Sequence, residues 1–269
     1  MKFSVLMSLY FKEKEDYLLS CLESLKQQTC QANEIVLVFD GEVSETLESI
    51  VQNFAEKLPL VIVRLPQNVG LGRALNEGLK HCANEWVFRM DTDDICLPTR
   101  FEKQINFIYQ NPNVVLLSSQ VEEFDETMME SIGIKQVPIN DNEIRVSALL
   151  RNPFNHMAVA YKKSVIEQVG GYQHHLYMED YNLWLRVIAQ EYEVYNLPDV
   201  LVNVRSGSAM YARRKGWEYI KSEYQLAKLK KELGLQSLIS SSMFFILRAL
   251  PRLLPTSLLG RLYKKLRKG

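Results

Sequence analysis

The stretch Trp86-Val87-Phe88-Arg89-Met90-Asp91-Thr92-Asp93-Asp94 says most about the fold of this chain. A short, mainly apolar run typical of a buried strand is followed at once by three carboxylates in four positions. Carboxylates this close repel one another unless a cation neutralises them. Mg²⁺ and Mn²⁺ suit such oxygen-rich sites and bridge carboxylates to substrate phosphates, so the stretch predicts a metal site. Acidic turns are common, and it is the buried strand before them that favours the metal.

Upstream of this stretch, short apolar runs alternate with segments of helical period. The expected strands are Phe3–Leu9, Glu34–Phe39, Leu60–Leu65 and Trp86–Met90, and the expected helices are one capped by Asp16 with Leu18, Leu19, Leu22 and Leu25 on one face, then Ser44–Lys57 and Gly70–Ala83. This alternation predicts an α/β fold with a mostly parallel central sheet flanked by helices.

Ligands of such sheets bind beyond the carboxyl ends of the strands. Those ends carry Ser8-Leu9-Tyr10, Asp40-Gly41 and the acidic turn. Polar groups at three strand ends are placed where a nucleotide would bind, although Asp40-Gly41 alone is equally typical of a simple turn.

The second half of the chain is less regular. It predicts a helix near Thr99–Gln110, a strand at Val114–Ser118, a loop or hairpin to about Asn140, a strand near Met157–Tyr161, a helix over Glu179–Gln190 and a strand at Val200–Val204. We therefore divide a domain of residues 1–232 into a nucleotide-binding half, 1–97, and an acceptor half, 98–215. Residues 233–269 form a separate tail.

Three further segments contain candidate site residues. Asn68-Val69-Gly70-Leu71-Gly72-Arg73 opens a helix: its glycines let backbone amides approach a ligand, and Arg73 is suited to a phosphate. A simple glycine turn is the competing interpretation, and a dinucleotide-binding motif is disfavoured because the third glycine is absent. Glu179-Asp180 begins a helix, where acids often only complement the helix dipole. Arg205 and Arg213 lie in or beside a Ser-Gly-Ser loop that is suited to closing over a diphosphate.

Composition places the chain among ordinary globular proteins, with 47% hydrophobic and 24% charged residues among 269. The four cysteines have no CxxC spacing and indicate a reducing compartment. The apolar N-terminus has no small-residue cleavage site, so we interpret it as a strand and expect a cytoplasmic protein. The net charge is zero and nothing indicates nucleic-acid binding.

The charge is unevenly distributed along the chain. Seven of the 32 basic residues, and no acidic residue, lie beyond Glu232. There, apolar clusters alternate with cations, which predicts a helical, basic tail on an anionic membrane surface. The alternative is a helical arm packed on the body of the protein or on a second subunit.

Taken together, the motifs resemble glycosyltransferase family 2, whose catalytic domain has the GT-A fold. The match runs from about residue 3 to 215, through Ser4–Tyr10, Asp40-Gly41, Asn68–Asn76, Asp91–Asp94 and Glu179–Arg186. It is strongest with bacterial members that build O-antigen, capsule or exopolysaccharide, including the amylovoran type.

The resemblance implies roles for individual residues. Ser8, Leu9, Tyr10 and Asp40 would hold the uracil, while Asn68, Gly70, Arg73, Thr92, Arg205 and Arg213 would complete the nucleotide-sugar site. Asp91 would contact the ribose or donor sugar, and Asp93, with Asp91, would bind Mn²⁺ or Mg²⁺. Asp180 would be the general base, assisted by Glu179.

The resemblance also implies the reaction. An inverting enzyme would move a hexose, galactose or glucose, from a UDP-sugar and form a β-linkage. The implied acceptor is an undecaprenyl-diphosphate-linked saccharide, used by a peripheral enzyme at the cytoplasmic face of the inner membrane.

Two departures and two alternatives accompany the resemblance. Many relatives have Asp-Asp-Gly-Ser where this chain has Phe39-Asp40-Gly41-Glu42, and many have a histidine after Arg205 where it has none, which leaves a third metal ligand in doubt. A sugar-phosphate nucleotidylyltransferase would need a glycine-rich loop after the first strand, in place of Tyr10–Glu13. A non-catalytic scaffold that binds only nucleotide is the other alternative.

Overall fold

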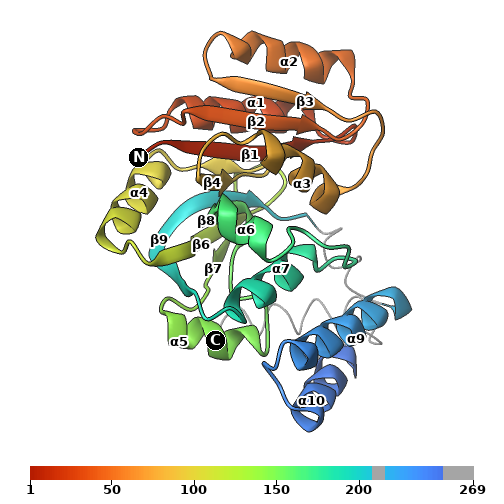
Figure 1. Ribbon diagram of the computed structural model, residues 1–269. Helices are drawn as coiled ribbons and strands as arrows, with labels where there is room; N and C mark the ends of the chain where they lie inside the picture. The colour runs from red at the N-terminus through yellow and green to blue at the C-terminus, as the bar shows by residue number, and fades with distance from the viewer. Residues whose placement is uncertain (208–215, 251–269) are drawn as a thin grey trace.

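Residues 1–207 and 216–250, which the computed structural model describes, form a mixed sheet with helices on both faces and a helical hairpin beside it (Figure 1). Four parallel strands make up its first half, in the order β3–β2–β1–β4. Their bounds are β1 Phe3–Leu9, β2 Glu34–Phe39, β3 Leu60–Arg64 and β4 Trp86–Arg89, and the connecting helices are α1 Glu15–Lys26, α2 Glu45–Ala55 and α3 Leu71–His81. The predicted alternation of strand and helix is confirmed here.

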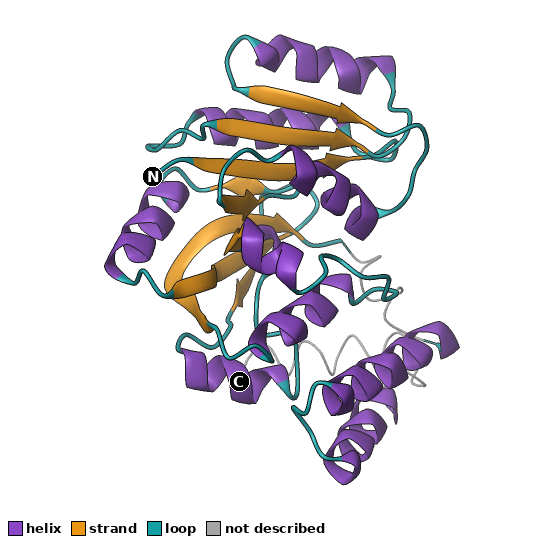
Figure 2. Cartoon of the chain, in the orientation of Figure 1, coloured by secondary structure: helices purple, strands orange, loops and turns teal. Residues whose placement is uncertain are grey.

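The two faces of this half-sheet pack against different helices, as Figure 2 shows. Side chains alternate along a strand, so Phe3, Val5 and Met7 of β1 join the core that contains α1 and α2. Leu6 points to the opposite face, against α3. There α3 lies so close that a Cβ on Gly78 would come within 2.5 Å of the Leu6 side chain. The carboxyl ends of β1, β2 and β4 consequently share one edge.

The second half of the sheet contains the antiparallel pairs. β8 pairs antiparallel with β4 and β6, β6 pairs parallel with β9, and β5 and β7 pair antiparallel with β9 and β6. The strands are β5 Ile95–Cys96, β6 Val114–Phe124, β7 Ser131–Lys135, β8 Ala160–Lys162 and β9 Glu193–Arg205; the helices are α4 Arg100–Gln110, α5 Asp141–Ala148, η1 His156–Ala158, α6 Lys163–Gln168 and α7 Glu179–Ile188. The sheet is thus parallel in its first half and mixed overall.

Several local predictions were wrong. Lys14, not Asp16, is the N-cap of α1, and Asp16 lies in the first turn. Leu19 is 49% exposed, because the buried stripe of α1 passes through Leu18, Cys21, Leu22 and Leu25. The strand expected from Met157 begins only at Ala160, since a single 3₁₀ turn precedes it. Helices α5 and α6 were not predicted.

The last described helices, α9 (Trp217–Glu232) and α10 (Leu238–Ala249), pack against each other as a hairpin. Arg248 donates to Glu223 at 2.5 Å, and Glu223 is 1% exposed. This member of the basic tail is therefore turned toward the protein. Arg213 and the other six tail cations lie outside the described residues. Within residues 1–207 and 216–250, no helix combines the length and apolarity needed to cross a membrane.

Candidate active site

The acidic turn after β4 forms a tight carboxylate cluster. One oxygen from each of Asp91, Asp93 and Asp94 lies within 4.8 Å of the other two. Asp94 is buried and accepts a hydrogen bond from the Arg205 backbone amide at 2.9 Å, so its carboxylate already has a protein partner. Asp91 and Asp93 are the two candidate ligands that the sequence predicted. Magnesium sites commonly use one or two carboxylates together with substrate phosphates, so these residues fit the metal that the sequence predicted.

Arg89 holds Asp91 in its charged form. The Arg89 guanidinium is fully buried and donates to the Asp91 carboxylate, while its Nε and Nη1 have no partner among the described residues. Burial opposes the charge on Asp91, but Arg89 and His156 outweigh it and lower the pKa of the carboxyl. Arg89 was not among the predicted site residues. The signal that could have identified it is a single cation in an otherwise apolar strand.

Asp93 and Asp94 have the opposite electrostatics. Burial and the neighbouring Asp91 raise the pKa of Asp93 to about 7. Burial and Asp93 raise the pKa of Asp94 well above its usual value. Both shifts follow from burial and from the crowding of negative charges, which a divalent ion bound at this turn would neutralise.

Glu13, a fourth carboxylate, borders the cluster. The buried Thr92 hydroxyl donates to Glu13, which ties the segment after β1 to the acidic turn. Burial raises the pKa of Glu13, and the negative charge of Asp91 adds to the increase. Nothing in the run of charged residues around position 13 distinguishes this one, so the sequence could not have identified it.

Arg205 buttresses the acidic turn. Its Nε donates to the Asp93 carbonyl oxygen at 2.9 Å, its Nη1 donates to the Glu126 carbonyl oxygen, and its guanidinium stacks 3.9 Å from the Tyr17 ring centroid. The side chain at the end of β9 is therefore anchored to the protein. The predicted contact from Arg205 to a diphosphate would need it to leave these partners.

Asp40 shapes the loop that opens α3. Its buried carboxylate accepts hydrogen bonds from the Asn68 side chain at 3.0 Å, the Val69 amide at 2.7 Å and the Gly70 amide at 3.1 Å. Gly41 is required beside it, since its φ is +86° and a Cβ would lie 2.6 Å from the Asn68 nitrogen. Asp40 thus has a positioning role that the sequence did not predict, and its contact with uracil stays a prediction.

The start of α3 meets the second half of the chain. A Cβ on Gly72 would lie 3.4 Å from both Glu179 and Tyr172. Asn76 forms two hydrogen bonds with the main chain of Tyr172, donating to its carbonyl oxygen at 2.7 Å and accepting from its amide at 2.8 Å. This contact brings residues of the first 97 positions together with residues of the second half of the chain.

Glu179 and Asp180 form the first turn of α7. Asn152 donates to the Asp180 carboxylate at 2.6 Å, and this contact fixes the side chain. Burial and the charge of Asp180 raise the pKa of Glu179. Asn152 lies 28 positions upstream, and no periodic pattern links the two residues, which is why sequence reasoning missed it.

The rest of the Glu179–Arg186 motif supports this turn. Arg186 donates to the Gly171 carbonyl oxygen at 2.5 Å, and Asn182 bonds His175, which in turn contacts the Ser222 carbonyl oxygen at 2.9 Å. His175 is fully buried and packs inside the protein, whereas His174 is exposed to solvent.

The remaining predicted residues lie at the same edge of the sheet. Ser8 is half-buried, Leu9 is buried and Tyr10 is 42% exposed beside Phe11. Arg73 is exposed on the first turn of α3 and forms no hydrogen bond within residues 1–207 and 216–250. It is free to bind a ligand.

Comparisons with known proteins agree with this geometry. The family model described as glycosyl transferase family 2 matches residues 4–170. The chain is 53% identical, over 99% of its length and 100% of the relative's, to the amylovoran biosynthesis glycosyltransferase AmsE of Erwinia amylovora. It is 38% identical, over 98% and 96%, to an Escherichia coli UDP-Gal:alpha-D-GlcNAc-diphosphoundecaprenol beta-1,3-galactosyltransferase. The structure of Staphylococcus aureus TarS 1–349 with UDP-GlcNAc superimposes with a TM-score of 0.70 at 20% identity, covering 92% of this chain and 72% of TarS.

Proposed function

The chain belongs to glycosyl transferase family 2 and has the GT-A fold, and we propose that it transfers galactose or glucose from a UDP-sugar to a lipid-diphosphate-linked saccharide with inversion. That it is a glycosyltransferase follows from family membership. The supporting observation is that the carboxylates of Asp91, in the carboxylate cluster, and of Asp180 both lie near Tyr172, where their charges add to the rise that burial causes in the pKa of the Tyr172 hydroxyl.

Donor binding is assigned to the first half of the chain, residues 1–97. Ser8, Leu9, Tyr10 and Asp40 would hold the uracil, beside the loop before α3 that the Asp40 carboxylate keeps in place. Arg73 would bind the diphosphate. Asp93 and Asp91 would hold Mn²⁺ or Mg²⁺, which when bound neutralises the charge of the departing UDP. Arg205 would contribute to the diphosphate site indirectly, by holding the acidic turn in place through its hydrogen bond to the Asp93 carbonyl oxygen.

Transfer is assigned to Asp180. Its carboxylate takes the proton of the acceptor hydroxyl, and the freed oxygen attacks the anomeric carbon of the donor sugar. The bond from that carbon to the diphosphate breaks on the opposite side, UDP leaves with the electron pair, and an α-linked donor gives a β-linkage. Asn152 orients the base, and Glu179, with its raised pKa, is suited to hold a sugar hydroxyl.

The acceptor assignment rests on relatives and on the surface of the hairpin. The E. coli relative is described as acting on a diphosphoundecaprenol-linked sugar. In this chain, the outer face of the hairpin is apolar: six large side chains are 52–83% exposed, namely Leu238, Ile239, Met243, Ile246, Leu247 and Leu250. We propose that this face lies on the cytoplasmic leaflet of the inner membrane as part of a tail, 233–269, distinct from the 1–232 domain, in a pathway of surface polysaccharide synthesis.

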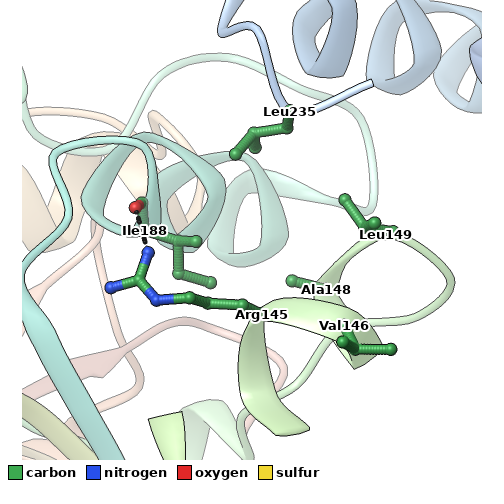
Figure 3. Close-up of a pocket in the computed structure, with 6 residues that line it drawn as sticks. All are labelled: Arg145, Val146, Ala148, Leu149, Ile188 and Leu235. Atoms are coloured by element: carbon green, nitrogen blue, oxygen red, sulfur yellow. Dashed lines mark hydrogen bonds between the residues drawn. The ribbon is translucent and has the colours of Figure 1, made fainter. Parts of the chain in front are cut away.

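A shallow apolar pocket of about 210 Å³ adjoins the start of α10, between α5, α7 and Leu235 (Figure 3). Arg145 contributes only its aliphatic part, because its guanidinium is bonded to Asp141, Ile188 and Tyr192. The cations that follow Leu250 in the sequence favour an anionic bilayer over a second copy, whose own cations would repel them.

Flotation with vesicles containing phosphatidylglycerol tests the membrane proposal. We expect Ile239→Ser with Met243→Ser and Ile246→Ser to reduce binding strongly. The matched control is Ile132→Ser with Ile134→Ser on β7, whose side chains are 49% and 47% exposed. Equal flotation of both variants would contradict the proposal.

Turnover with UDP-galactose or UDP-glucose, Mn²⁺ and a synthetic GlcNAc-diphosphate-lipid tests the reaction. Asp180→Asn should keep donor binding and lose transfer by about 10²–10⁴-fold, the usual contribution of a general base. Asp93→Ala should lose metal-dependent UDP binding, whereas the surface variant Asp199→Asn should keep both. UDP binding without turnover of any donor would favour a scaffold instead.

A further inference from the structure

The segment 152–159 spans the site from the base to the acidic turn. At its start, Asn152 donates to Asp180. At its end, the Val159 carbonyl oxygen accepts a hydrogen bond at 2.9 Å from the amide of Arg89, the residue that holds Asp91. Asn155, between them, is fully buried and donates to the Ser119 carbonyl oxygen at 2.9 Å, so the segment is firmly held.

His156 lies in the middle of this segment, near the charges of both Asp91 and Asp180. Its Nε2 is 2.8 Å from the Tyr172 hydroxyl, and its ring packs 6.0 Å from the Trp184 ring centroid. Tyr172 is itself held by the two main-chain hydrogen bonds to Asn76 and lies beside Gly72. The imidazole is therefore fixed on one edge, next to the contact between α3 and Glu179.

The other ring nitrogen has no protein partner among the described residues. Nδ1 makes no hydrogen bond within residues 1–207 and 216–250, and His156 is partly exposed. Burial and the positive charge of Arg89 lower the pKa of His156 to about 4. The ring is thus neutral at physiological pH, and Nδ1 offers a hydrogen bond without a charge.

We propose that His156 is a sugar-binding residue, whose Nδ1 hydrogen-bonds a hydroxyl of the donor hexose between Asp91 and Asp180. The inference rests on the proposed sugar transfer. A neutral, oriented imidazole suits a hydroxyl, which needs one directed partner and no counter-charge. Tyr172 has a positioning role, since its hydroxyl on Nε2 fixes the ring and the tautomer that faces the sugar.

Three substitutions distinguish this role from simple packing. Asparagine places its amide near the position of Nδ1, whereas glutamine reaches the position of Nε2 and alanine reaches neither. Calorimetry with Mn²⁺ would compare UDP with UDP-galactose and UDP-glucose. We expect His156→Ala and His156→Gln to weaken binding of the UDP-hexose relative to UDP by about tenfold, a lost hydrogen bond, and His156→Asn to keep most of it.

Deoxy donors identify the hydroxyl. The 3-, 4- and 6-deoxy UDP-hexoses each lack one hydroxyl. The analogue that lacks the hydroxyl bound by His156 should bind to wild type and to His156→Ala with equal affinity. Tyr172→Phe should lose about two- to threefold, because the ring is retained but no longer fixed.

Two results would overturn the inference. One is an unchanged ratio of UDP-hexose to UDP affinity in all three His156 variants. The other is a change confined to the KM of the lipid-linked acceptor. Since UDP-hexose affinity is measured without turnover, absence of transfer in the wild type would refute the proposed function and leave this test intact.

Discussion

Proton release on metal binding tests the electrostatics of the acidic turn. With its pKa near 7, the Asp93 carboxyl is about one-tenth ionised at pH 6 and about nine-tenths ionised at pH 8. A divalent ion binds the ionised form and must displace the proton. The apparent affinity for Mn²⁺ in the presence of UDP should therefore fall about tenfold from pH 8 to pH 6, or about 1.4 kcal/mol.

Isothermal titration calorimetry in buffers of different ionisation enthalpy measures both quantities at once. We expect close to one proton released per Mn²⁺ at pH 6 and far fewer at pH 8. The Asp199→Asn control should behave like wild type, because Asp199 is a surface residue paired with Lys103. If the Mn²⁺ affinity and the number of protons released were the same at pH 6 and pH 8, the assignment of Asp93 as a metal ligand that must lose a proton would be refuted.

Three further predictions concern stability. Without metal, the folded state binds the Asp93 proton more tightly than the unfolded chain, so Tm should fall as pH rises from 5 to 8, and Mn²⁺ with UDP should remove this fall in a thermal-shift series. Gly41→Ala should lower the free energy of unfolding in urea by about 3 kcal/mol or more, because the added Cβ clashes with the backbone. Gly234→Ala, at φ +71° but with open space around it, should lower it by about 1 kcal/mol. Equal losses for the two variants would contradict the steric argument. Arg248→Met removes a partner of the buried Glu223 and should lower the free energy of unfolding by about 3 kcal/mol. Lys221→Met, in the exposed pair with Glu218, should lower it by about 0.5 kcal/mol. Similar urea midpoints for the two variants would refute the internal role of Arg248.

The sequence predicted the parts of the site that lie at strand ends. Asp91–Asp94 and the start of α3 could be located because buried strands and a glycine-opened helix have periodic, local signatures. Asn152 and His156 could not, because their importance comes from contacts with Asp180 and Tyr172 that are distant along the chain. Glu13 differs from its charged neighbours only in where the chain places it. Arg205 was predicted to contact a diphosphate, whereas its contacts with Tyr17 and Glu126 hold it against the acidic turn.

The mixed half of the sheet was the less predictable part of the fold for a related reason. β6 and β9 continue well past the predicted strands because each is paired along its length by the other. Such pairing is non-local, so propensity within one segment does not reveal it. Helix α5 is short and lies on the surface, with Val146 65% exposed, and its apolar period is correspondingly weak.

The side-chain amide of Asn76 donates one hydrogen bond to the main chain of Tyr172 and accepts another from it, as residues of neighbouring β-strands do. These two hydrogen bonds depend on the course of the backbone at position 172 and not on the side chain there, so they restrict the conformation of the loop. Gly171 enforces that course, since a Cβ there would lie 2.6 Å from the Asn76 oxygen. Hybrids that exchange the acceptor half between relatives to alter the acceptor should therefore be joined so that residues 76 and 171–172 come from compatible parents.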